Sequence, residues 1–131
     1  MARVTLTGEH AHFLLEWKED GSGDFLVSIE TEADDFRGHA DGHVTGKDLR
    51  QFTGDLKRLE QSRNGKAQLI SAAPGEFAVT IRAIDRAGHM GISGVLSYLR
   101  PGPERPAQKF EFFFEFDPSQ LMQAVKDAHA A

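Results

Sequence analysis

The alternation of apolar and polar residues is strongest between residues 109 and 117, which read KFEFFFEFD. Because side chains on a β-strand point to opposite faces in turn, this pattern predicts a strand with Phe110, Phe112, Phe114 and Phe116 on one face. A phenylalanine side chain buries roughly 150–250 Å², so the strand needs a wide apolar surface to pack against. We expect a central strand, because a flat hydrophobic edge would invite aggregation.

Seven further stretches show weaker alternation. Four precede the first helix, at residues 3–7, 12–17, 25–30 and 36–44, and polar turns at 18–23 and 33–35 join them into a meander. Gly38 and Gly42 weaken the fourth of these strands. Three more are expected at 67–71, 77–83 and 90–99, where glycines in the last favour a β-bulge. Three prolines in residues 101–106 exclude regular structure from the longest loop.

The first helix is predicted by apolar residues that recur with 3-4-3 spacing and form one stripe. These residues are Leu49, Phe52, Leu56 and Leu59. Thr45 is a suitable N-cap, and Asn64-Gly65 is expected to end the helix as a left-handed C-cap. We expect the stripe at Leu56 and Leu59 to pack against Phe112 and Phe114.

A second helix is predicted directly after the phenylalanine strand. Asp117 is a good N-cap, Pro118 suits the first helical position, and Gln120 is placed to close a capping box. Its expected packing face consists of Leu121, Val125 and Ala128, together with Met122.

These elements predict an α+β fold, with a mainly antiparallel β-sheet of about eight strands and two helices packed on it in the order ββββαββββα. The length of 131 residues fits a single domain that covers residues 1–131. Four strands and a helix occur twice. However, matches such as residues 23–25 with 75–77 pair the third strand with the sixth, so an internal duplication remains an open hypothesis.

The composition narrows the class of protein. The absence of cysteine excludes disulfides, thiolate nucleophiles and cysteine-ligated zinc. The sequence has no run of about 18 apolar residues, and its N-terminus lacks the apolar region of a signal peptide. We therefore expect a cytoplasmic protein that does not contact a membrane.

Charge is unevenly distributed along the chain. Residues 1–41 carry ten acidic and three basic residues, a net charge of −7, whereas residues 42–131 carry ten acidic and twelve basic residues, a net charge of +2. An acidic N-terminal third argues against direct binding of nucleic acid, which requires clustered Lys and Arg. It suits a basic protein partner, with Glu30, Glu32, Asp34 and Asp35 as candidate contacts. The alternative is that these acidic residues only keep the protein soluble.

His39, Asp41 and His43 are the strongest candidates for metal ligands. On a regular strand, positions i, i+2 and i+4 share a face, so two imidazoles and a carboxylate would converge there. Such a set suits Zn²⁺, or Fe(II) with open positions. The alternative is that these residues form the solvated polar face of a glycine-interrupted strand.

Motifs for other chemistry are missing. The sequence contains no Gly-x-Ser-x-Gly elbow, no phosphate-binding glycine loop and no dinucleotide fingerprint. Glu111 and Glu115 would lie roughly 13 Å apart on one strand face, too far for a two-carboxylate mechanism. We therefore predict no catalytic residues, no cofactor and no bound metal.

From about residue 49 to residue 121 the chain resembles the WapI type of small bacterial immunity protein. The shared features are a helix of the form F-x3-L-x2-L, the segment with Gly65, Ala67 and Leu69, the Gly88-His89 pair, and an aromatic strand that runs into a helix started by an aspartate. Here these are Phe52, Leu56 and Leu59, and then Phe112, Phe114, Phe116, Asp117 and Leu121. The resemblance implies a protein that binds and neutralises a toxin domain made by the same cell, and it brings no catalytic residues.

The residues leave three function classes open. The leading prediction is a non-enzymatic protein-binding domain of the immunity type. The second is a small metal-dependent enzyme that uses His39, Asp41 and His43, and the third is a ligand-binding module with a pocket under the sheet.

Overall fold

The computed structural model describes residues 2–73, 75–98 and 108–129. Sheet A contains β1 (Ala2–Gly8), β2 (Ala11–Glu19), β3 (Phe25–Ala33) and β4 (Phe36–Val44), and α1 (Gly46–Ser62) follows it. Sheet B contains β5 (Lys66–Ile70), β6 (Phe77–Ala83), β7 (Met90–Tyr98) and β8 (Gln108–Phe116), followed by α2 (Gln120–His129). The predicted α+β class and element order are confirmed, with the eight strands divided between two antiparallel sheets. Leu99 and the proline-rich loop at 101–106 lie outside the described residues.

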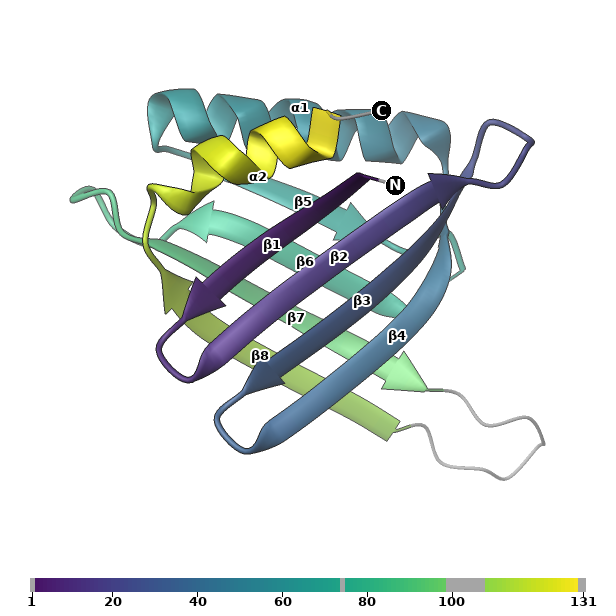
Figure 1. Cartoon of the computed structure of the whole chain (residues 1–131), viewed down its shortest axis with the longest axis horizontal. Helices are drawn as coiled ribbons and strands as arrows, with labels where there is room; N and C mark the ends of the chain where they lie inside the picture. Colours follow the sequence, from purple (N-terminus) through teal and green to yellow (C-terminus); the bar gives the residue numbers. More distant parts are fainter. Residues whose placement is uncertain (1, 74, 99–107, 130–131) are drawn as a thin grey trace.

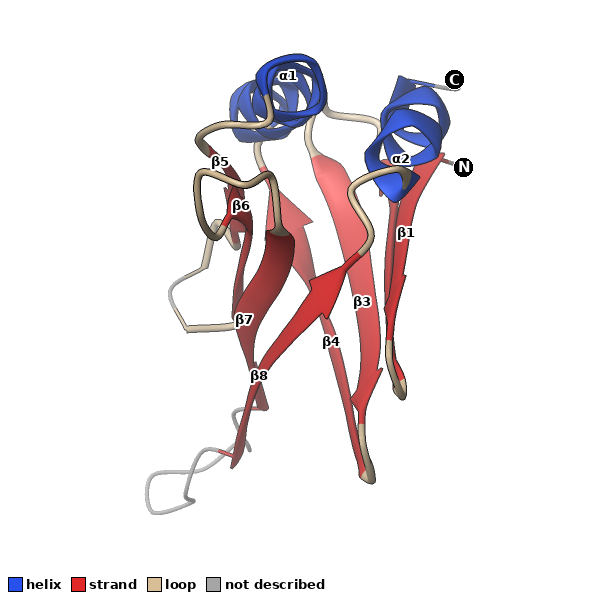
Figure 2. Cartoon of the chain, turned by 90° about the vertical axis from the view of Figure 1, so that its left-hand side faces the viewer, coloured by secondary structure: helices blue, strands red, loops and turns tan. Residues whose placement is uncertain are grey.

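The two sheets are meanders that face each other, and their strands run across one another (Figure 1). Both helices lie at one end of the pair of sheets (Figure 2). α1 packs on β5, β6 and α2, while α2 also packs on β1. In the described part of the chain, no helix covers the outer face of either sheet.

The core fills the space between the sheets. Phe13 of β2 stacks on Phe112 of β8, with ring centroids 6.1 Å apart. Phe112 also lies 5.9 Å from Phe110 and 6.5 Å from Phe114 by ring centroids, so β8 presents an aromatic ladder to the core. Phe112 and Phe114 are buried, as expected. The expected partner was wrong, because this ladder packs against sheet A, whereas α1 packs chiefly on β5.

The expectation of a central phenylalanine strand was also wrong, because β8 is an edge strand of sheet B. Its aromatic face is buried by the opposite sheet, through contacts with β1 and β3, so it needs no strand on its second side. Gly8 of β1 lies directly against the backbone oxygen of Glu115, where any larger residue would clash. Glu111 and Glu115 lie on the outer face with Phe113, and charge on an edge strand discourages pairing with other chains.

The glycine-containing strands are more regular than the sequence predicted. β4 pairs with β3 in one continuous register, from Phe25 opposite Val44 to Ala33 opposite Phe36. Gly38 of β4 leaves space for the ring of Phe110, which a larger side chain would occupy. β7 keeps a continuous register with both of its neighbours, so the predicted bulge was wrong.

One helix cap of α1 is confirmed and the other was misplaced. The Oγ1 atom of Thr45 accepts a hydrogen bond from the backbone N–H of Asp48 at 3.1 Å, as a capping residue should. The left-handed C-cap residue is Arg63, with φ 57°, and not Asn64-Gly65. Its backbone N–H still makes the ordinary helical bond to the carbonyl of Leu59, at 2.8 Å, and its left-handed φ then ends the helix one residue earlier than predicted.

The start of α2 differs from the predicted capping box. Gln120 turns away from Asp117 and binds β1: its Oε1 accepts from the N–H of Thr7 at 2.8 Å, and its Nε2 donates to the carbonyl of Thr7 at 2.7 Å. The amide thus satisfies two backbone groups on an edge strand. Met122 is 54% exposed, so it was wrongly placed in the packing face, where Ala124 lies instead.

We expect replacement of Gln120 by alanine to lower the free energy of unfolding by about 1–3 kcal/mol, since each lost hydrogen bond contributes about 0.5–1.5 kcal/mol. Gln123→Ala is the matched control, because the Gln123 side chain is exposed and, among the described residues, hydrogen-bonds Asp127 of the same helix alone. Chemical denaturation of the two variants measures the difference. Equal stabilities would show that the Gln120–Thr7 bonds contribute nothing to holding α2 on β1.

Candidate functional site

The charge asymmetry of the sequence becomes an asymmetry between the two layers of the molecule. The acidic segment, residues 1–41 with a net charge of −7, makes up nearly all of sheet A. The remaining residues, which build α1, sheet B and α2, carry a net charge of +2. Sheet A lies on one side of the molecule and sheet B on the other (Figure 2). A partner approaching sheet A therefore meets the negative side.

The four acidic residues predicted to bind a partner follow one strand and its turn. Glu30 and Glu32 point outward from β3, and Asp34 and Asp35 form the turn into β4. The register places Glu30 between Leu14 and His39 on the outer face. The fold therefore places the four in one run toward the end of β3, an interior strand, and in the turn that follows it.

Two of these residues already interact with neighbouring groups, which makes them less suitable for charge reversal. Glu32 lies 3.5 Å from the guanidinium of Arg37 in an exposed ion pair, an interaction that is weak in water. Asp34 has φ 54°, and its N–H donates to the carbonyl of His10 at 2.9 Å. This left-handed conformation is tolerated best by Gly, Asn and Asp. Glu30 and Asp35 are therefore the better positions for charge reversal.

The predicted metal ligands are only partly brought together. His39, Asp41 and His43 all point outward from β4, and the Nε2 atom of His39 lies 3.0 Å from the Oδ2 atom of Asp41. Within the described residues, no three His, Asp or Glu side chains are grouped closely enough to hold a metal ion. His43 and Asp41 both line a hollow on the same face, with His43 nearer the end of the strand.

We therefore expect the purified protein to carry no stoichiometric transition metal. Elemental analysis of protein expressed without chelator measures this directly. One zinc or iron per chain, lost in the His39→Ala/His43→Ala variant, would instead show that these residues hold a metal ion.

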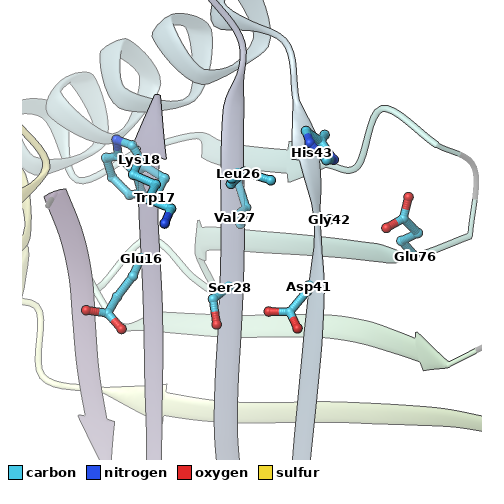
Figure 3. Close-up of a pocket in the computed structure, with 10 residues that line it drawn as sticks. All are labelled: Glu16, Trp17, Lys18, Leu26, Val27, Ser28, Asp41, Gly42, His43 and Glu76. Carbon is cyan, nitrogen blue, oxygen red and sulfur yellow. The ribbon is translucent and has the colours of Figure 1, made fainter. Parts of the chain in front are cut away.

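A hollow of about 560 Å³ opens on the outer face of sheet A (Figure 3). Three adjacent strands, β2, β3 and β4, supply most of its lining. Ser28 lies between Glu16 and Asp41 in one row of the sheet, and Leu26 lies between Lys18 and His43 in the next. Because the side chain of Ser28 is small, it forms the floor of the hollow in the first row, and Glu16 and Asp41 stand on either side of it.

A third carboxylate reaches the hollow from the other sheet. Glu76, in the loop before β6, lies beyond the free edge of β4 (Figure 3). Gly42 permits this approach, since a side chain there would meet the Oε2 atom of Glu76 at 2.7 Å and the ring of Phe77. The same loop is tied to β4 by a hydrogen bond from the N–H of Ala72 to the carbonyl of His43, at 2.7 Å.

The electrostatics of the hollow favour a cation. Glu16, Asp41 and Glu76 surround it, and Lys18 is the sole basic residue besides His43 in its lining. In the β2–β3 turn, hydrogen bonds from the hydroxyl and N–H of Ser22 lower the pKa of Asp20, a further carboxylate of sheet A. The arrangement can bind a positive group.

Sequence reasoning missed Glu16, Leu26 and Glu76. The first two could have been found by writing out the register of the predicted meander, because Glu16, Ser28 and Asp41 then fall in one row. Glu76 gave no such signal, since it reaches the hollow through the packing of the two sheets.

A second histidine–carboxylate pair lies in the turn between β6 and β7. The Nδ1 atom of His89 is 2.6 Å from the Oδ2 atom of Asp85, and this hydrogen bond raises the pKa of His89 and lowers that of Asp85. Asp85 also accepts a hydrogen bond from the N–H of Ala87 at 2.9 Å. The pair is exposed and stabilises its own turn, away from the hollow on sheet A.

The fold and the site define a two-sheet α+β protein with an open, acidic sheet face. The chain belongs to the WapI-like immunity protein family, whose model matches residues 3–131. The match extends the resemblance seen at residues 49–121 to the N-terminal strands, and so includes sheet A. Comparison with curated proteins and with solved structures gives no match.

Family membership implies an immunity-type role: binding a protein partner, without enzymatic activity. Of the two helices in the described ranges, neither is long and apolar enough to cross a membrane.

Proposed function

We propose that this chain is a bacterial immunity protein that binds a basic toxin domain made by the same cell and neutralises it in the cytoplasm. The observation that carries the proposal is the concentration of negative charge in sheet A, whose outer face no helix of the described residues covers. An acidic surface attracts a basic partner over distances comparable to the Debye length, about 8 Å at physiological salt. The family match supplies the general role.

Glu30, Glu32, Asp34 and Asp35 act in this proposal as steering charges. They lie at the margin of the outer face, and long-range attraction requires charge without close fit. Neutralisation follows when the bound immunity protein blocks the working surface of the toxin domain.

The test uses the toxin domain encoded by the gene next to the one for this chain. Isothermal titration calorimetry should give a complex, and an equimolar amount of the chain should abolish the toxin's activity. A noncognate basic protein of similar size is the control, and we expect it to bind at least about 100-fold more weakly, since specificity requires fit as well as charge. If the neighbouring toxin domain neither binds nor loses activity, the proposed function is wrong.

A further inference from the structure

In the described residues no helix covers the outer face of sheet A, and this face contains a hollow. Neither the family match nor the steering charges give the hollow a role. We propose that the toxin domain docks across this face and inserts one lysine or arginine side chain into the hollow between Glu16 and Asp41. The inference rests on the proposed function, because it assigns the contact surface of that same partner.

The geometry of the sheet sets the size of the group that fits. Neighbouring strands lie about 4.8 Å apart, so side chains on β2 and β4 that share a row are separated by roughly 10 Å. Glu16 and Asp41 occupy such positions, with Ser28 between them. A guanidinium or ammonium group between two carboxylates at this spacing can hydrogen-bond to one of them and is attracted electrostatically by the other.

The floor of the hollow suits the aliphatic part of such a side chain. Leu26, in the next row, is 36% exposed and is flanked by Lys18 and His43. Lysine and arginine bury their methylene groups on apolar surface while their charged ends contact polar groups. A cationic side chain entering over Leu26 therefore places its methylenes on leucine and its charge between the carboxylates.

The carboxylates retain unused capacity for hydrogen bonds. Glu16 is half-buried and forms no ion pair with any residue in the described ranges. Asp41 contacts His39 through Oδ2 alone. Charge-assisted hydrogen bonds to arginine are often bidentate, and arginine is enriched among the residues that dominate binding energy at interfaces.

The surroundings match the anatomy of a protein interface. A partly apolar hollow lies near Leu14 and is bordered by charged residues such as Glu30, which resembles a central anchor site with a polar rim. A second hollow, of about 490 Å³, lies where β1 meets β8 and is lined by the carboxylates of Glu9, Glu115 and Asp117. We assign the basic partner to the hollow on sheet A because that hollow lies on the outer face of the layer that carries most of the negative charge.

The test compares two pairs of isosteric substitutions against the neighbouring toxin domain. The hollow variant is Glu16→Gln/Asp41→Asn, and the matched control is Glu111→Gln/Glu115→Gln, which removes the same charge from an outer sheet face. Surface plasmon resonance should show that the hollow variant binds about 10–100-fold more weakly, mainly through faster dissociation. The control should bind within about twofold of the wild type. Melting temperatures must agree among the variants, and Ser28→Leu, which fills the hollow, provides a second variant with an intact charge.

The outcomes separate the two proposals. If the wild type binds the toxin domain, and the hollow variant and Ser28→Leu bind it equally well, the inference is wrong and the proposed function still stands. Failure of the wild type itself to bind the toxin domain would overturn both. If the hollow variant is weakened, alanine substitution of each basic residue of the toxin should identify one whose loss costs the wild type at least about tenfold in affinity but costs the hollow variant little.

Discussion

Replacing Phe114 with alanine should lower the free energy of unfolding by about 3–5 kcal/mol, as is usual for a large aromatic side chain lost from a core. Phe114 is 7% exposed and lies in the aromatic ladder of β8, where its ring contacts the backbone of Gly8. Sheet A and sheet B meet through this ladder. A cavity at Phe114 therefore loosens the contact between the two layers.

The neighbouring residue provides a control on the same strand. Phe113 points to the outer face of sheet B and is 49% exposed, so Phe113→Ala should cost about 1 kcal/mol or less. Urea unfolding of both variants measures the difference. A larger loss at Phe113 than at Phe114 would mean that the wrong face of β8 has been assigned to the core.

The second large effect is expected in the kinetics of association. Reversing Glu30 and Asp35 to lysine changes the charge of sheet A by +4 and should slow association with a basic toxin domain by about tenfold at low salt. Both residues are exposed, and neither adopts the left-handed backbone found at Asp34. The fold should therefore survive the change, which melting temperatures would verify.

The matched control reverses Glu111 and Glu115, which adds the same charge to the outer face of sheet B. Stopped-flow association rates at low and high salt distinguish the two variants. A specific effect of sheet A is largest at low salt and shrinks as salt rises, because salt screens exposed charges. Equal rates for the two variants would show that only net charge matters, and that the acidic segment is a solubility device.

The elements of this fold were predictable because the signals for them are local. Alternation defines each strand within a few residues, and the stripe from Leu49 to Leu59 defines α1. Thr45 was identified as a cap because its hydroxyl needs only a backbone N–H three residues later.

Features that depend on tertiary contacts were not predictable in the same way. Burial of the phenylalanine face indicates a large opposing surface, but it does not say whether that surface is a helix or a second sheet. The position of β8 at an edge depends on Gly8 and β1, more than 100 residues away in sequence. Gln120 likewise binds Thr7 instead of completing its own helix cap.

The candidate site also combines features that were visible in the sequence with features that depend on tertiary contacts. The acidic character of sheet A was visible in the sequence as a cluster of charges before residue 42. The hollow required the register between strands, and Glu76 required the packing of the β5–β6 loop against β4. The three candidate metal ligands share a strand face, as the sequence indicates, but only His39 and Asp41 lie within hydrogen-bonding distance, and in the described residues no group of three is close enough to hold a metal ion.

The central claim is that the partner binds the outer face of sheet A, and methyl cross-saturation in the complex tests it most directly. Leu14 and Leu26 report on that face, while Ile70 and Val95 report on the outer face of sheet B. With a perdeuterated, methyl-labelled chain and a protonated toxin domain, saturation of the toxin should reduce the methyl signals of Leu14 and Leu26 and spare those of Ile70 and Val95. Loss of signal at Ile70 and Val95 with Leu14 and Leu26 unaffected would contradict the claim.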